Sequence, residues 1–312
     1  MADIRKVATR QSYGEALVEL GAAHDDFVVL DADLAAATQT GKFKAAYPDR
    51  FIDVGVAEQN LMGVAAGIAT TGHRVFASTF AMFAAGRAFE QVRNSIGYPH
   101  LHVVIGATHA GMSVGEDGAT HQCNEDLALM RAIPGMTVIV PADDVEAKAA
   151  VRAAYEAEGP VYVRLGRLPV PVIHKDDYHF ELGRGVVERE GSDVTVVACG
   201  LEVSAALEAA KTLVDKGLSC EVINMATVKP LDGDLIVASA RKTGRVVTVE
   251  EHSVIGGLGS AVCDLLCEAC PTPVKKIGVN DVFGESGPAL DLLAKYGLDG
   301  AGVAAAIEGF VR

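Results

Sequence analysis

The stretch DVGVAEQNLMGVAAG, residues 53–67, decides the fold class of this 312-residue chain. An extended run at 51–56 leads directly into small residues in a helical pattern. Glu58 therefore falls in the first turn of a helix, near the carboxyl end of a strand. Open α/β sheets bind their ligands at that edge.

Simpler explanations exist for this stretch taken alone. An acid in a first helical turn interacts favourably with the helix dipole, which is sufficient reason for Glu58. Gly63, Ala66 and Gly67 form a stripe of small residues at helical spacing. Such a stripe indicates only that another backbone packs closely against the helix.

Strand and helix patterns alternate on both sides of this stretch. We expect strands at 27–30, 51–54, 74–77, 102–105, 137–140 and 161–164, and helices near 9–20, 58–70, 82–96, 124–132 and 143–157. Alternation of this kind predicts a mostly parallel sheet wrapped by helices.

A change of composition then divides the chain into two domains. The proline-rich segment 168–171 precedes the polar run 174–179, which has little to bury. We expect an α/β domain over 1–170, a linker over 171–185 and a smaller α/β domain over 186–312. The second domain has strands at 194–198, 219–224, 245–250 and 274–277, with helices at 201–216, 232–243, 259–270, 288–296 and 302–310.

Composition excludes several classes of partner. The net charge of −14, with no basic block, argues against nucleic acid and anionic membrane surfaces. The chain shows neither a signal-peptide core nor a run of about 18 apolar residues. Six scattered cysteines are typical of reduced thiols. We therefore expect a cytoplasmic protein.

Two local patterns are attributed to packing. Cys263, Cys267 and Cys270 match a C-x3-C-x2-C iron–sulfur pattern, but their helical spacing predicts that they extend the inner face of an amphipathic helix. The glycine-rich segment 256–259 lacks the spacing of phosphate-binding loops, so we expect tight strand-to-helix packing there.

The densest polar run is THAGMSVGEDGATHQ, residues 108–122, which follows the strand expected at 102–105. It brings His109, His121 and an acidic pair into one loop at the carboxyl end of a strand. A lone histidine is more often structural, but this combination favours a site that hydrogen-bonds hydroxyls and moves protons.

Three motifs resemble one family in order and spacing. They are GVAEQN at 55–60, STFAMF at 78–83 and GEDGATHQ at 115–122. Together they resemble the pyrimidine-binding and C-terminal domains of transketolase and its relatives, from about residue 9 to the C-terminus.

The resemblance implies thiamine diphosphate as the cofactor. Glu58 then hydrogen-bonds N1′ of the aminopyrimidine ring, and Phe80 and Phe83 form an aromatic platform for that ring. Asp33 corresponds to an acid near the cofactor at the subunit contact. Plain core packing remains open for the two phenylalanines, and capping of a loop for Asp33.

The resemblance also implies a substrate channel. His109 and His121 contact sugar oxygens and share the catalytic role with Glu58, and Asp117 recognises a hydroxyl next to the carbonyl. Arg10 and Arg164 hold the substrate phosphate, although most arginines are surface charges. Two positions depart from the family: Ala37 stands where a serine usually assists the arginines, and Gly86 replaces an aromatic residue.

One family element is missing. The Gly-Asp-Gly motif and later Asn that bind Mg²⁺ and the diphosphate do not occur in this sequence. The resemblance therefore implies the C-terminal subunit of a split transketolase, which obtains the Mg²⁺ ligands from a separate N-terminal subunit, in an α2β2 assembly acting on sugar phosphates. Deoxyxylulose-phosphate synthase, the β subunit of a 2-oxo acid dehydrogenase and a silent scaffolding subunit remain as alternatives.

Overall fold

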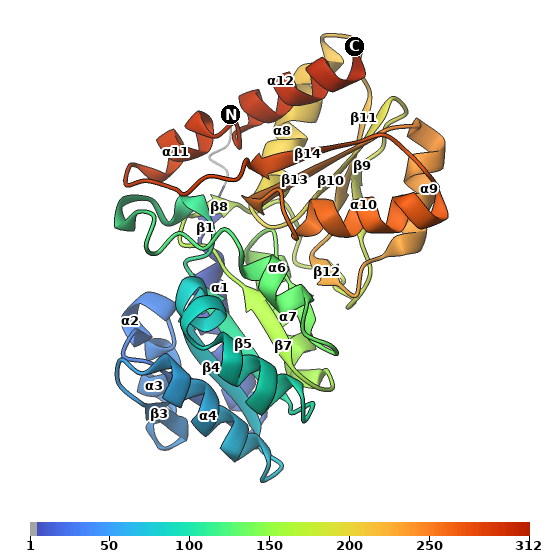
Figure 1. Ribbon diagram of the computed structural model, residues 1–312. Helices are drawn as coiled ribbons and strands as arrows, with labels where there is room; N and C mark the ends of the chain where they lie inside the picture. Colours follow the sequence, from blue (N-terminus) through green and yellow to red (C-terminus); the bar gives the residue numbers. More distant parts are fainter. Residues whose placement is uncertain (1–4) are drawn as a thin grey trace.

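A computed structural model describes residues 5–312 and shows two large β-sheets, each covered by helices (Figure 1). The first sheet has the order β12-β6-β7-β5-β4-β2-β3. Its parallel strands are β2 (Phe27–Asp31), β3 (Phe51–Asp53), β4 (Arg74–Phe80), β5 (Val103–Thr108), β6 (Thr137–Ile139) and β7 (Val161–Arg164). The prediction of a mostly parallel sheet is confirmed.

Apolar side chains cover both faces of this sheet. Helices α1 (Thr9–Ala23) and α7 (Asp144–Glu156) pack on one face, in a core that includes Tyr13, Phe27 and Phe76. Helices α4 (Glu58–Ala69) and α6 (Asp126–Arg131) pack on the other face, in a core that includes Leu30 and Ile105. Burial on both faces explains why these strands are nearly continuous apolar runs.

The helix expected at 82–96 is present but is not a regular α-helix. The structure has a π-helical turn at Phe83–Arg87, a short α5 (Phe89–Gln91) and a second π-helical segment at Val92–Gly97. Helices α2 (Ala35–Thr38) and α3 (Gly41–Ala46) were not expected either. The π-helical turns are common at functional sites because they redirect side chains within a helix.

The second sheet has the order β14-β13-β10-β11-β9. Strands β10 (Val194–Ala198), β11 (Cys220–Asn224), β13 (Val246–Ser253) and β14 (Val274–Val279) are parallel, and β9 (Val186–Arg189) is antiparallel. Helices α8 (Glu202–Val214) and α12 (Gly300–Val311) cover one face, and α9 (Gly233–Thr243) and α10 (Leu258–Ala269) the other (Figure 1). Helix α11 (Ala289–Lys295) precedes α12.

Two short pairings tie distant parts of the chain together. Strand β12 (Thr227–Lys229) follows β11 in sequence but pairs antiparallel with β6 at the edge of the first sheet. Strands β1 (Lys6–Val7) and β8 (Val170–Pro171) also pair. The sheet of the first half therefore contains a strand from the second half. In residues 5–312, no helix is long and apolar enough for a membrane span.

The prediction that three cysteines extend the inner face of α10 is wrong for Cys263 and Cys267. The inner face of α10 consists of Leu258, Ala261, Val262 and Leu266, together with Gly259. Cys267 is exposed, and Cys263 and Cys270 are half-buried. Cys263 and Cys267 each lie one position after an inward-facing residue, and a step of about 100° per residue turns them off the core. Cys270 follows the end of the helix and packs against the core. The described residues contain no group of three His, Cys, Asp or Glu side chains that could hold a metal ion.

The expected packing of the glycine-rich segment is confirmed. A Cβ at Gly257 would lie 2.0 Å from Oε2 of Glu250, which is closer than any real contact. The Glu250 carboxylate also accepts hydrogen bonds from the backbone N–H groups of Leu258 and Gly259, at 2.7 and 2.8 Å. It thereby occupies the N-terminus of α10.

Candidate active site at the carboxyl edge of the first sheet

The register of the first sheet brings the ends of four strands together. Asp31 of β2 is level with Asp53 of β3 and Ser78 of β4, and Phe80 of β4 is level with Thr108 of β5. Because these strands are parallel, the residues that follow them emerge at one edge. This places the three motif regions next to one another.

An aromatic cluster forms at this edge. The rings of Phe80 and Phe83 stack with centroids 5.7 Å apart and planes inclined by 15°. The His109 ring stacks on Phe80 at 3.8 Å, and the His121 ring meets Phe83 edge-on at 5.4 Å. The structure thus unites two aromatic residues and two histidines from separate motifs.

Hydrogen bonds determine the proton position on His109. Nη1 of Arg10 lies 3.3 Å from its Nε2, and Oγ1 of Thr108 lies 2.9 Å from its Nδ1. A guanidinium can only donate, so Nε2 accepts and Nδ1 carries the proton. Burial, together with the charges of Arg10 and Arg167, lowers the pKa of His109 to about 3. His109 is therefore neutral at physiological pH.

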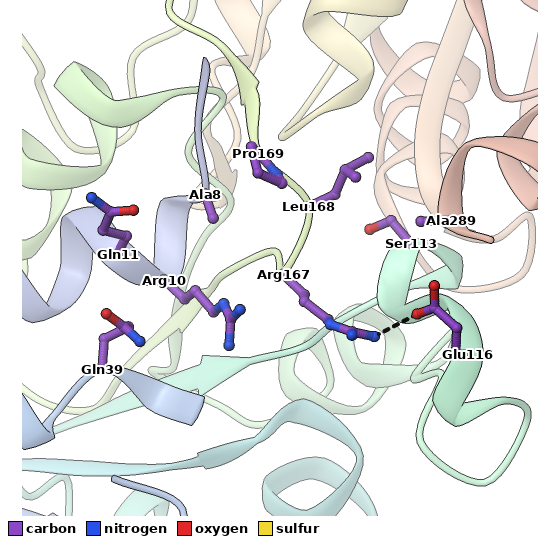
Figure 2. A pocket seen from close by; sticks show the side chains of 10 residues that line it. All are labelled: Ala8, Arg10, Gln11, Gln39, Ser113, Glu116, Arg167, Leu168, Pro169 and Ala289. Atoms are coloured by element: carbon purple, nitrogen blue, oxygen red, sulfur yellow. Dashed lines mark hydrogen bonds and ion pairs between the residues drawn. The ribbon is translucent and has the colours of Figure 1, made fainter. Parts of the chain in front are cut away.

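A cavity of about 360 Å³ opens beside this histidine (Figure 2). Two arginines face it from opposite sides: Arg10 at the start of α1 and Arg167 after β7. The complete lining is Ala8, Arg10, Gln11, Gln39, Ser113, Glu116, Arg167, Leu168, Pro169 and Ala289.

The Arg10 guanidinium has no carboxylate partner among residues 5–312. It donates to the Ala37 carbonyl at 2.8 Å and otherwise contacts only His109. Burial and the nearby charge of Arg167 lower the pKa of Arg10. A half-buried guanidinium with a second cation nearby is suited to binding an anion.

Arg167 is held on the other side by the polar loop. Its Nη1 donates to Oε2 of Glu116 at 2.9 Å and to the Val114 carbonyl, and lies 3.9 Å from Oδ2 of Asp117. Figure 2 shows the Arg167–Glu116 pair on the wall of the cavity. Asp117 is exposed next to this pair. The acidic pair of the polar loop therefore lies beside an arginine of the cavity.

The structure does not bring Arg164 to Arg10, which corrects the expectation that these two form the cationic pair. Arg164 ends β7, and its buried Nε donates to Oδ2 of Asp126 at 2.8 Å. Its Nη2 donates to the carbonyls of Cys123 and Glu251. Burial alone would lower the pKa of Arg164, but the Asp126 carboxylate raises it. These contacts are structural.

Arg167 is the residue that sequence reasoning missed. A usable signal was present, because Arg164 stands inside an apolar strand pattern whereas Arg167 comes after it. Residues beyond the carboxyl end of a strand point into the ligand-binding edge, and residues within it face the helices.

Glu58 lies at the same edge, and its side chain is buried at 5% exposure. Its Oε2 is 3.7 Å from Nε of Arg87, in the π-helical turn that begins at Phe83. On the outer side of α4, Gly63 and Gly67 are exposed, and a Cβ at either would meet nothing within 4 Å. Ala66 is buried, so only the two glycines of the stripe face outward.

Asp33 lies at the exposed turn after β2, with a φ of +63°. Its N–H donates to Oδ1 of Asp53 at 3.1 Å. The loop is held instead by the buried Asp31, whose carboxylate accepts hydrogen bonds from Thr38 and Thr40 at 2.7 and 2.8 Å. The Asp33 side chain is therefore not needed to hold this loop.

The second sheet holds the polar loop in place. The buried Glu251 carboxylate of β13 accepts the N–H of Ser113, and Gln122 Nε2 donates to the Glu285 carbonyl at 2.9 Å. A Cβ on Gly115 would lie 3.2 Å from the Gly287 carbonyl oxygen. Residues 112–122 therefore fit between the two halves of the chain.

Comparisons with known proteins identify relatives over nearly the whole chain. Residues 5–172 match the family described as "Transketolase, pyrimidine binding domain", and residues 183–303 match "Transketolase, C-terminal domain". A putative transketolase C-terminal section of Methanocaldococcus jannaschii is 50% identical, covering 95% of this chain and 93% of that protein.

Two further relatives are of similar length. A 6-deoxy-6-sulfo-D-fructose transketolase subunit of Clostridium sp. is 45% identical, covering 93% of this chain and 90% of that protein. A solved structure described as a split gene transketolase, inactive beta4 tetramer, is 58% identical with a TM-score of 0.91, covering 97% of this chain and 98% of that one.

Proposed function

The chain belongs to the transketolase family, and we propose that it is the C-terminal subunit of a split transketolase that transfers a two-carbon ketol unit between sugar phosphates. The main support for this proposal is that one sheet edge holds Glu58, the Phe80–Phe83 pair and the two loop histidines. Beside it lies a cavity lined by two arginines.

The residues present fit the aminopyrimidine half of thiamine diphosphate. A buried carboxylate at a strand end, Glu58, is suited to accept a hydrogen bond from a ring nitrogen. The stacked rings of Phe80 and Phe83 offer a flat apolar surface to a heteroaromatic ring. Asp33 is a further polar group at this edge. When bound, thiamine diphosphate supplies the carbon nucleophile that carries the ketol unit.

The described residues do not offer a site for the diphosphate half. They contain no group of acidic or histidine ligands for Mg²⁺, and the Glu250 carboxylate occupies the N-terminus of α10. We therefore assign Mg²⁺ and diphosphate binding to a separate N-terminal subunit. An α2β2 assembly would place the open face of α4 at a subunit contact.

This chain's own residues bind and orient the sugar. His109 and His121 extend from the aromatic cluster toward substrate oxygens, and the neutral His109 can accept or donate a hydrogen bond once Arg10 moves to an anion. Asp117 recognises a hydroxyl. The anionic end of the substrate lies between Arg10 and Arg167, a role that replaces the one expected for Arg164.

The test is reconstitution. Ketol transfer from a ketose phosphate to an aldose phosphate is measured with this chain alone, with the partner subunit alone and with both. We expect activity only in the mixture; full activity of this chain alone would refute the split-subunit proposal. Pyruvate decarboxylation, measured in parallel, identifies a synthase-like or dehydrogenase-like subunit, and an inert mixture identifies a scaffolding subunit.

A substitution tests the role of Glu58. Glu58→Gln should reduce transfer at least about a hundredfold while the complex stays assembled, because loss of one essential proton-handling group has that size of effect. Glu19→Gln, at an exposed position of α1, serves as the control. Retained transfer in the Glu58 variant would contradict the assignment.

A further inference from the structure

Ser113 carries a buried hydroxyl in the cavity wall that the described structure leaves unused. Its side chain is 1% exposed, and its Oγ has no hydrogen-bond partner among residues 5–312. Buried polar atoms in folded proteins nearly always have a partner, so each exception needs an explanation. The cavity that Ser113 shares with Arg10 and Arg167 provides one.

The other side of the cavity lacks a hydroxyl. Arg10 donates to the backbone carbonyl of Ala37, and that residue has only a methyl side chain. Gln39, which follows in the same segment and lines the cavity, donates its amide to the Ala36 carbonyl. On this side the cationic cavity therefore presents a guanidinium and no serine or threonine.

Ser113 is held in a fixed position by the second half of the chain. Its backbone N–H donates to Oε1 of the buried Glu251, which also packs against Gly111. This bond uses the backbone N–H and not the hydroxyl. Figure 2 shows the Ser113 oxygen directed to the side of the cavity where the two arginines lie. A serine has three staggered rotamers, so its hydroxyl can turn to an anion without backbone movement.

We propose that Ser113 is a substrate-binding residue that donates its hydroxyl to the anionic group held by Arg10 and Arg167, in place of the hydroxyl that Ala37 cannot supply. A tetrahedral oxyanion such as phosphate has more acceptor sites than two arginines fill. The anion then bridges three segments: the start of α1, the segment after β7 and the polar loop. This inference rests on the proposed function for the identity of the substrate.

Binding of inorganic phosphate tests the inference without catalysis. Calorimetric titration of phosphate into the assembled complex is compared between the wild type and Ser113→Ala. We expect about a tenfold weaker association for the variant, since a hydrogen bond to a charged group contributes that much. Ser95→Ala, in the π-helical segment Val92–Gly97 and outside the cavity lining, should bind phosphate as the wild type does.

Kinetics supply the second test. Ser113→Ala should raise KM for a ketose phosphate about tenfold, with kcat within about twofold and KM for the unphosphorylated ketose unchanged. Ser113→Thr, which keeps the hydroxyl, should restore KM. Ala37→Ser added to Ser113→Ala should restore part of it, because the hydroxyl then comes from the opposite wall.

The outcomes separate the two proposals. A wild-type complex that binds phosphate but transfers no ketol unit overturns the proposed function, and the calorimetric comparison still decides the role of Ser113. Equal phosphate affinity and equal KM values in the wild type and Ser113→Ala overturn the role of Ser113, whatever the reaction.

Discussion

Nη1 of Arg10 lies 3.3 Å from Nε2 of His109, so the same guanidinium faces both the cavity and a histidine of the aromatic cluster. The nearby positive charge disfavours a second proton on His109. If Arg10 binds the anionic end of a substrate as proposed, that binding and the protonation of His109 are coupled through one side chain.

The first prediction concerns the protonation of His109. Because its pKa is lowered to about 3, its ring signals should not titrate between pH 5 and 9 in an NMR experiment. Arg10→Gln should raise this pKa toward the usual value without reaching it, since burial is the larger cause and remains. Titration of wild-type His109 near pH 6.5 would contradict the neutral assignment.

The second prediction separates Arg164 from Arg167. Arg164→Gln leaves the buried Asp126 carboxylate without its cation and should cost about 3–5 kcal/mol in the free energy of unfolding, measured with urea. Arg167→Gln should cost less than about 1 kcal/mol, because its ion pairs are exposed.

Binding of a sugar phosphate should show the reverse order, with the larger effect from the Arg167 substitution. Arg167→Gln should raise KM for a sugar phosphate at least about tenfold, and Arg164→Gln, assayed where it remains folded, should not raise it selectively. A stable Arg164 variant with weakened phosphate binding would restore the sequence-based assignment.

The third prediction concerns pH and Glu251. Burial raises the pKa of Glu251 to about 7, above the ordinary value near 4.5. Between these values the folded state binds more protons than the unfolded state, so this group's stabilising contribution is complete below about pH 4.5 and is lost as the pH rises through 7.

A glutamine at position 251 does not ionise, so Glu251→Gln removes the loss of stability with rising pH. Its amide oxygen can still accept the hydrogen bond from the Ser113 N–H. We compare the unfolding free energy of the variant minus that of the wild type at two pH values. This difference should be more positive at pH 8 than at pH 4.5, by on the order of 3 kcal/mol. Chemical denaturation at both pH values measures this, with exposed Glu268→Gln as the control. Parallel pH profiles for the wild type and Glu251→Gln would exclude this titration.

The fourth prediction uses the open face of α4. Gly63→Ala and Gly67→Ala should each stabilise the isolated chain by about 0.5–1 kcal/mol, because alanine favours a helix and the added Cβ meets nothing within 4 Å. If a subunit packs there, the same changes should weaken assembly, as measured by light scattering. Gly309→Ala in α12, equally open, should stabilise without affecting assembly.

Apolar periodicity was sufficient to predict most of the fold. The pattern at 194–198 matches β10 residue for residue, and the helix expected at 58–70 differs from α4 by one residue. The π-helical turns after Phe83 were missed because a π turn and an α turn have the same composition. Strand β12 was missed because three residues carry no periodicity, and its partner β6 lies about 90 residues earlier.

The site was predictable where motifs were dense. His109, His121, Phe80 and Phe83 meet, as the family resemblance implied, because adjacent parallel strands deliver them to one edge. The sequence did not reveal that Arg164 pairs with Asp126 away from the cavity, because the side chain's direction depends on where the strand ends, three residues before Arg167. The free hydroxyl of Ser113 depends on a backbone bond to Glu251, 138 positions away, which no local pattern reveals.

The pairing of β12 with β6 limits where the chain can be cut into two separately produced halves. A cut in the segment between the two sheets would leave the first half with β6 as an open edge strand, bare of the partner that now covers it. Unprotected edges of that kind recruit other chains and promote aggregation. We therefore expect the first half to be more prone to aggregation when it is produced without residues 227–229.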